Sequence, residues 1–243
     1  MLTRQDLKMS LVHQYPLYDF HEMYDTDGFV RFQPNPFVLA WKNEYIFKLH
    51  GTAYEMNMIY LAGDCAVPVL GPAMQKGKIA GFVMRRETPL RDCLSNKKEI
   101  MYNLIQLTED LHGKGIIHGD IKLDNMLLCA DGKIRFCDFT GSILKRHSSE
   151  GRVASTPNYL SPYRALNPKG PFTEEDDRFA LGVTIWEIFT GKRPFIDWKG
   201  GYVREKIRAG FVVDLSEIED EEARQVAEEL MSYMLQKSPQ KMT

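Results

Sequence analysis

The chain has 243 residues, of which 44% are hydrophobic and 26% charged, which is typical of a globular protein with one large domain or two small lobes. Its formal net charge of −2 creates no bulk field for nucleic acid or an anionic membrane, so neither is expected as a partner. The four cysteines show no CxxC spacing, which predicts neither a zinc site nor a disulfide framework and favours an intracellular, cytoplasmic or nuclear location.

The N-terminal residues 1–27 are rich in aromatic side chains without a clear period, and we interpret them as an N-terminal arm. They contain no continuous apolar core, so no signal peptide is expected. The longest apolar run, residues 179–189, is too short to span a bilayer and contains Glu187, so no transmembrane segment is expected.

The first third of the chain is dominated by short runs of Val, Ile and aromatic residues, separated by polar breaks, and such runs predict strands. The predicted strands span residues 28–32, 37–41, 45–49, 67–70 and 79–84. Residues 52–61 predict a helix between the third and fourth strands. Turns are predicted at Gly71-Pro72 and at Lys76-Gly77.

The remainder of the chain is predicted to be helical. Apolar residues recur at helical spacing over residues 97–111, and further helices are predicted at about 177–190 and 220–235. A β-rich part followed by a helical part predicts an α+β fold with two lobes, with a cleft between them as a common place for a ligand. The predicted boundaries are an N-lobe over 28–84, a hinge over 85–89 and a C-lobe over 90–243.

Four polar side chains in or after the apolar run IIHGDIKLDNMLL (residues 116–128) suggest a site of chemistry. Asp120, Lys122 and Asn125 lie within this run, and Asp138 follows in IRFCDFTG. The sequence ADGK between MLL and KIRFC predicts a hairpin, which would bring Asn125 and Asp138 together. An amide oxygen beside a carboxylate suits Mg²⁺. Asp120 could then act as a base on a hydroxyl, and Lys122 could neutralise a transferring phosphoryl group.

These residues lie in HGDIKLDN (118–125) and DFT (138–140), which resemble the H-R-D-x-K-x-x-N and D-F-G motifs of eukaryotic protein kinases. Three later segments, STPNYLSPY (155–163), DRFALGV (177–183) and GKRPF (191–195), resemble further motifs of that superfamily in the same order. The resemblance covers roughly residues 28–240. It implies a two-lobed protein kinase-like fold that uses ATP and Mg²⁺ for phosphoryl transfer.

The class of acceptor is suggested by two of these features. Lys122 is typical of serine/threonine protein kinases, and STPNYLSPY is similar to the segment that docks a peptide hydroxyl. The resemblance therefore implies transfer to Ser or Thr of a protein substrate. The pattern H-G-D-x-x-x-x-N is also typical of small-molecule phosphotransferases with this fold, and this alternative stays open. The sequence predicts no oligomeric state.

The β-rich part carries the implied nucleotide contacts. YIFKL (45–49) resembles the V-A-I-K strand of protein kinases, which implies that Lys48 binds the α- and β-phosphates. By the same resemblance Ile46 lies above the adenine, Leu127 forms its floor, and Met84 is the gatekeeper before the hinge.

Glu55 is the implied helix partner of Lys48. A competing interpretation is local, because Thr52 and Glu55 have the spacing of a capping box, in which the glutamate binds a backbone N–H.

Two departures from the pattern favour a different alternative, a pseudokinase that acts as a binding or scaffold protein. QPNP (33–36) stands in place of the glycine-rich loop, and its prolines offer no N–H to phosphates. Thr140 replaces the glycine after Asp-Phe and stiffens that turn. Gly119 also replaces the arginine that binds a phosphate on the activation loop, so we expect activity to be independent of phosphorylation within residues 141–155. The alternative is that a phosphate there pairs locally with Lys145, Arg146 or Arg152.

Asp177 heads an almost wholly apolar helix and is expected to be buried, so it needs hydrogen-bond donors. The resemblance implies that these are backbone N–H groups near His118, and that His118 itself is a packing residue.

Tyr163 replaces the glutamate of the A-P-E motif, and its usual arginine partner is missing. By the same resemblance, a terminal helix of the usual fold is also expected to be missing.

Overall fold

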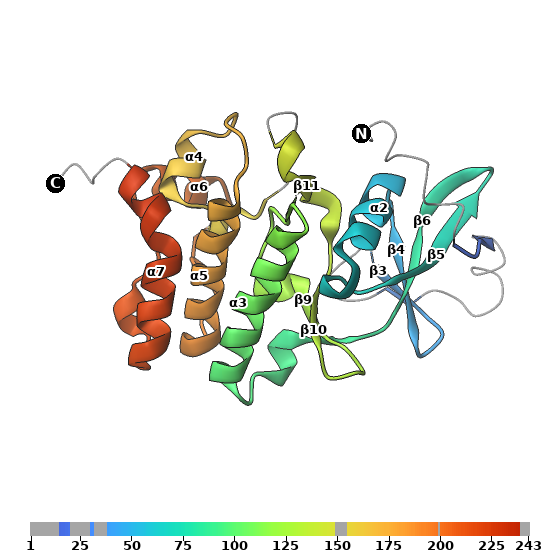
Figure 1. Cartoon of the computed structure of the whole chain (residues 1–243), viewed down its shortest axis with the longest axis horizontal. Coiled ribbons are helices and arrows are strands. Elements are labelled where there is room, and N and C mark those ends of the chain that lie inside the picture. Colours follow the sequence, from blue (N-terminus) through green and yellow to red (C-terminus); the bar gives the residue numbers. More distant parts are fainter. Residues whose placement is uncertain (1–14, 20–29, 32–37, 149–154, 199, 239–243) are drawn as a thin grey trace. The chain divides into compact units, whose positions relative to one another are not determined.

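The computed structural model describes residues 15–19, 30–31, 38–148, 155–198 and 200–238 (Figure 1). The chain forms two compact units, the first from residues 1–88 and 127–140, the second from residues 89–126 and 141–243. The first unit is built around a β-sheet and the second is mainly helical. The predicted α+β class, with a β-rich N-lobe and a helical C-lobe, is confirmed.

A six-stranded sheet in the order β1-β5-β6-β4-β3-β2 organises the first unit. Its strands are β1 (Tyr18–Asp19), β2 (Val30–Arg31), β3 (Val38–Trp41), β4 (Tyr45–Leu49), β5 (Val69–Gln75) and β6 (Lys78–Arg85). Strand β1 runs parallel to β5, and the other neighbouring strands are antiparallel. Leu39, Phe47, Ala73 and Val83 form a buried cluster that anchors the strands on each side of Lys48.

The strand predicted at residues 45–49 is present with these ends, and those predicted at 37–41, 67–70 and 79–84 are present with shifted ends. The run 28–32 lies partly outside the described residues. The turn predicted at Lys76-Gly77 is confirmed, but the turn at Gly71-Pro72 is wrong. Both residues lie inside β5, where the pairing with β6 shifts register between Val69 and Gly71. A Cβ on Gly71 would lie 2.1 Å from the carbonyl oxygen of Pro16, so the glycine serves a close backbone approach.

Helix α2 (Ala53–Ala62) and the 3₁₀ turn η3 (Gly63–Cys65) follow β4 in the first unit, and the helix predicted at residues 52–61 is confirmed. The predicted hairpin is also confirmed, as β9 (Met126–Leu128) paired with β10 (Ile134–Phe136). The N–H of Val67 donates to the carbonyl of Phe136 at 2.9 Å. This bond ties β10 to the segment between η3 and β5, which lies much earlier in the sequence.

The second unit is built from helices. They are α3 (Lys97–Gly113), α4 (Pro162–Leu166), α5 (Glu174–Thr190), α6 (Gly200–Arg208) and α7 (Glu221–Lys237), with β8 (Ile116–Ile117) and β11 (Ile143–Leu144) as an antiparallel pair. Figure 1 shows α5 between α3 and α7, and residues 179–188 of α5 are buried throughout. The helices predicted at 97–111, 177–190 and 220–235 are confirmed. Within the described ranges, no helix is both long and apolar enough to cross a membrane.

Further short elements connect these parts. They are β7 (Thr88–Pro89) and the 3₁₀ turns η4 (Leu90–Cys93), η5 (Leu123–Asn125), η6 (Phe139–Gly141), η7 (Lys145–His147), η8 (Pro157–Tyr159) and η9 (Leu215–Glu217).

Candidate active site

Lys48 lies at the centre of a polar cluster in the first unit. Its Nζ donates to the carboxylate of Glu55, to Oδ1 of Asp138 at 2.7 Å and to Oγ1 of Thr140 at 3.1 Å. The side chains of Lys48 and Glu55 are 15% and 2% exposed, whereas that of Asp138 is 38% exposed. The cluster therefore joins a buried ion pair to a carboxylate that reaches solvent.

A tight connection between β4 and α2 brings Lys48 and Glu55 together. His50 follows β4 with a positive φ of 57°, and Thr52 caps the helix by accepting the N–H of Glu55 at its Oγ1, 3.1 Å away. The Glu55 carboxylate binds Lys48. Of the two interpretations of Glu55, the structure contains the ion pair of its carboxylate with Lys48, while its backbone N–H donates to the Thr52 hydroxyl that caps the helix.

The ionisation of the pair follows from burial and charge. Burial favours the neutral form of Lys48, but the carboxylates of Glu55 and Asp138 outweigh this effect, so the pKa of Lys48 is raised. Burial raises the pKa of Glu55, and Lys48 opposes that rise. Lys48 is therefore charged at neutral pH, which is the state needed to bind an anion such as a phosphate.

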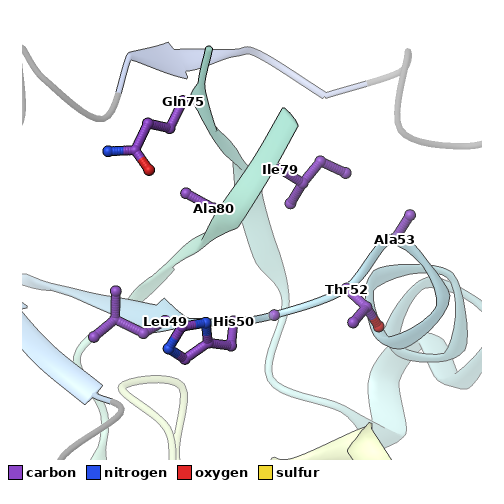
Figure 2. Close-up of a pocket in the computed structure, with 8 residues that line it drawn as sticks. Leu49, His50, Thr52, Ala53, Gln75, Ile79 and Ala80 are labelled. Atoms are coloured by element: carbon purple, nitrogen blue, oxygen red, sulfur yellow. The ribbon is translucent and has the colours of Figure 1, made fainter. Parts of the chain in front are cut away.

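The implied adenine contacts lie on three strands of the first unit. Ile46 and Met84 are opposite each other on β4 and β6, and Leu127 lies in β9. Figure 2 shows a separate pocket of about 580 Å³ in the same unit, at the end of β4 and the start of α2. It is lined by Leu49, His50, Gly51, Thr52, Ala53, Gln75, Ile79 and Ala80 and includes none of the implied contacts. The segment QPNP lies outside the described residues.

In the second unit, the Asp120 carboxylate of the segment HGDIKLDN (118–125) accepts hydrogen bonds on both of its oxygens. Its Oδ2 accepts Lys122 Nζ at 2.7 Å and Asn125 Nδ2 at 3.0 Å, and its Oδ1 accepts the N–H of Thr156 at 2.6 Å. Lys122 also donates to Oγ1 of Thr156 at 2.6 Å. The three polar residues predicted from spacing are thus assembled around one carboxylate.

The apolar residues of this segment explain how the polar ones are held. Ile121 and Leu123 are 0% and 1% exposed, whereas the side chains of Asp120 and Lys122 are 15% and 19% exposed. Alternate residues therefore anchor the loop in the core and present the charges at its edge. Thr156 was not singled out from the sequence, although it lies in STPNYLSPY.

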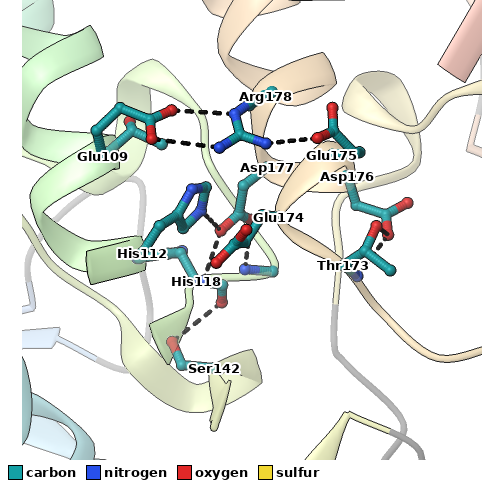
Figure 3. A network of polar contacts seen from close by, with 12 residues as sticks. Glu109, His112, His118, Ser142, Thr173, Glu174, Glu175, Asp176, Asp177 and Arg178 are labelled. Carbon is teal, nitrogen blue, oxygen red and sulfur yellow. Dashed lines mark hydrogen bonds and ion pairs between the residues drawn. The ribbon is translucent and has the colours of Figure 1, made fainter. Parts of the chain in front are cut away.

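Asp177, 0% exposed, fixes the backbone before Asp120 (Figure 3). Its Oδ2 accepts the N–H of His118 and its Oδ1 that of Gly119, both at 2.8 Å. The predicted donors and the buried position of His118 are confirmed. His112 Nε2 lies 3.0 Å from Oδ2 and is a third, unpredicted partner from α3. Gly119 has a φ of 81°, a conformation that favours glycine.

Two buried networks hold the segment STPNYLSPY and were not predicted. Arg164 donates through Nε and Nη2 to the two oxygens of Asp176, 2.8 Å each, and also to three backbone carbonyls. Glu187 accepts the hydroxyl of Tyr159 at 2.7 Å and Nη2 of Arg91 at 2.8 Å. The partners of Glu187 are far from it in sequence, whereas Arg164 binds Asp176 at the acidic start of α5, which is a local signal.

The implied magnesium ligands remain a prediction, because Asn125 belongs to the second unit and Asp138 to the first. Asn125 uses Nδ2 for both of its bonds to Asp120, which leaves its amide oxygen as the available ligand atom. In the described parts of the chain no group of three or more His, Cys, Asp or Glu side chains could hold a metal ion. An amide oxygen and a carboxylate are each the type of ligand that Mg²⁺ accepts, and phosphate and water complete its oxygen shell in nucleotide sites.

The sequence was compared with known families and proteins. The family model described as protein kinase domain matches residues 38–242. The CBL-interacting serine/threonine-protein kinase 17 of Arabidopsis thaliana is 30% identical over 175 residues, which is 70% of this chain and 37% of that protein. The Aurora kinase of Schizosaccharomyces pombe is 26% identical over 200 residues, 82% of this chain and 52% of that protein. This chain thus spans about half or less of these relatives' length, and by the family match it belongs to the protein kinase domain family.

Proposed function

We propose that this chain transfers the γ-phosphoryl group of ATP to Ser or Thr of a protein substrate. The observation that carries the proposal is the arrangement around Asp120, whose carboxylate is held by Lys122, Asn125 and the backbone of Thr156. A carboxylate held in this way can accept the proton of an acceptor hydroxyl. Lys122, between Asp120 and Thr156, can stabilise negative charge on the group in transfer.

The nucleotide is assigned to the cluster of the first unit. Lys48, kept charged by Glu55, binds the phosphates, and Ile46, Met84 and Leu127 contact the adenine. Asp138 and Asn125 are the proposed Mg²⁺ ligands. When bound, the metal neutralises charge on the phosphate oxygens.

A protein acceptor is favoured over a small molecule by the bond between Lys122 and Thr156. It joins the segment HGDIKLDN (118–125) to STPNYLSPY, the stretch similar to a peptide-docking segment. That stretch is anchored by the buried partners of Tyr159 and Arg164, as expected for a surface that must keep one shape. The relatives named above include a serine/threonine-protein kinase, which agrees with this choice.

The experiment is a phosphotransfer assay with ATP and Mg²⁺ on a generic protein acceptor and on small cationic acceptors. Asp120→Asn should lower turnover by about 10²- to 10⁴-fold, the usual contribution of a general base, and leave ATP binding nearly intact. Asp131→Asn is the matched control, because Asp131 is an exposed carboxylate that pairs with Arg135 on the β9–β10 turn. Wild-type turnover in Asp120→Asn would refute the assignment.

A catalytically weak binding protein is the second candidate, favoured by the direct bond between Lys48 and Asp138 at 2.7 Å. Both side chains must contact the nucleotide or its metal in an active kinase. Thermal shift with ATP, with and without Mg²⁺, separates the two candidates because ligand binding raises apparent stability. A shift that needs the metal supports the kinase, and no shift supports the binding protein.

A further inference from the structure

Thr140 is an exposed residue whose hydroxyl both donates and accepts a hydrogen bond inside the Lys48 cluster. Its Oγ1 donates to Oδ1 of Asp138 at 2.7 Å and accepts from Nζ of Lys48 at 3.1 Å. A hydroxyl has one donor and two acceptor positions, so both bonds can exist together. The side chain thus links the candidate metal ligand to the candidate phosphate-binding cation.

The same residue also shapes the backbone of Asp138. The N–H of Thr140 lies 3.4 Å from Oδ1 of Asp138, and Asp138 has a φ of 61°, in the left-handed region that few non-glycine residues adopt. Aspartate tolerates this region when its side chain binds the backbone two residues on. Lys48 and both donors of Thr140 reach the same carboxylate oxygen, which restricts rotation of the carboxylate.

We propose that the Thr140 hydroxyl is a positioning group that orients Asp138 for a divalent cation bound together with ATP. The inference rests on the proposed function. Carboxylates that ligate metals are themselves commonly held by hydrogen bonds from neighbouring groups, and loss of such a partner weakens metal affinity by about 10- to 100-fold. A glycine, the residue of the D-F-G pattern, has no side-chain group for this role.

A purely steric role for Thr140 makes a different prediction. If the residue only stiffens its turn, valine, which is also β-branched, should replace it without loss. If the hydroxyl orients Asp138, valine should fail and serine should succeed. Thr140→Val and Thr140→Ser therefore separate the two roles, and exposure of the site makes both variants compatible with folding.

The test measures Mn²⁺ binding by electron paramagnetic resonance, with a non-hydrolysable ATP analogue at saturation. Thr140→Val should raise the Mn²⁺ dissociation constant at least tenfold, and Thr140→Ser should stay within about threefold of wild type. Thr190→Val is the matched control, because the Thr190 hydroxyl donates to a helix carbonyl in the other unit, 2.8 Å away. It should bind Mn²⁺ as the wild type does. Unliganded melting temperatures verify that each variant is folded.

The outcomes distinguish this inference from the proposed function. Equal or tighter Mn²⁺ binding by Thr140→Val, or equal weakening by Thr140→Ser, would overturn the positioning role while leaving the kinase proposal intact. If the wild type binds metal and nucleotide but phosphorylates no acceptor, the kinase proposal is refuted. The positioning role is then still decided by Mn²⁺ binding to the Thr140 variants. A wild type that binds no Mn²⁺ with the nucleotide would overturn both.

Discussion

Removal of the Asp177 carboxylate should destabilise the second unit strongly. In Asp177→Ala the N–H groups of His118 and Gly119 lose their acceptor, and so does Nε2 of His112. A buried donor without a partner costs about 1–3 kcal/mol, so the two backbone groups together suggest a loss of about 4 kcal/mol. For a chain of this size, such a loss lowers the melting temperature by about 8–16 °C.

Asp177→Asn should have an intermediate effect. The two N–H groups bind different carboxylate oxygens, and an asparagine offers only one oxygen. One N–H would therefore face an amide NH₂, at a cost of about 2 kcal/mol. Turnover should fall in both variants, because the backbone that presents Asp120 is no longer held.

Urea unfolding followed by far-ultraviolet circular dichroism measures these losses. The matched control is Glu109→Ala, which removes a partially exposed partner of Arg178 from the neighbouring network (Figure 3) and should cost less than about 1 kcal/mol. If Asp177→Ala cost no more than Glu109→Ala, the carboxylate would not be the anchor of this loop, and the reasoning would be refuted.

Three other changes have expected outcomes. Lys48→Met should cost about 1.5–3 kcal/mol at pH 7. The folded-state pKa of Lys48 is raised above 10.5, so urea unfolding at a series of pH values should show a deficit at pH 7 that shrinks as the pH rises above 10.5. Gly119→Arg should destabilise by about 1–2 kcal/mol in thermal unfolding, because it forces a side chain into the left-handed region, and a stable variant would contradict this. Arg164→Lys should lower stability in the same assay although it keeps the charge, because a lysine cannot reproduce the two-oxygen bond to Asp176, and an unchanged melting temperature would argue against that bond.

The sequence could predict those parts of the site whose interacting residues lie close together along the chain. Asp120, Lys122 and Asn125 lie within six residues, and their spacing alone suggested a shared site, which the hydrogen bonds on Asp120 bear out. The helix at 97–111 was predictable because only one of its faces is buried. The Lys48–Glu55 pair was also within reach, since the two residues are separated by a single turn.

The parts that could not be predicted depend on distant or non-periodic features. Helix α5 was predicted, but it is buried on nearly all sides, so its sequence has no polar face that would show its neighbours. The partners of Arg164 and the contact of His112 with Asp177 join residues from separate elements. The turn prediction at Gly71-Pro72 was wrong for another reason. Glycine and proline occur both in turns and at irregularities inside a strand, and the sequence does not distinguish the two.

The interruption of the first unit by residues 89–126 has a consequence for how the protein is made. Residues 1–88 leave the ribosome without the hairpin that contains Phe136 and without Asp138, so the carbonyl for Val67 and one partner of Lys48 are still missing. At about 5–20 residues per second, the missing fifty or so residues take roughly 3–10 s to follow. During that interval the first unit is incomplete, and a chain truncated after residue 88 would remain so.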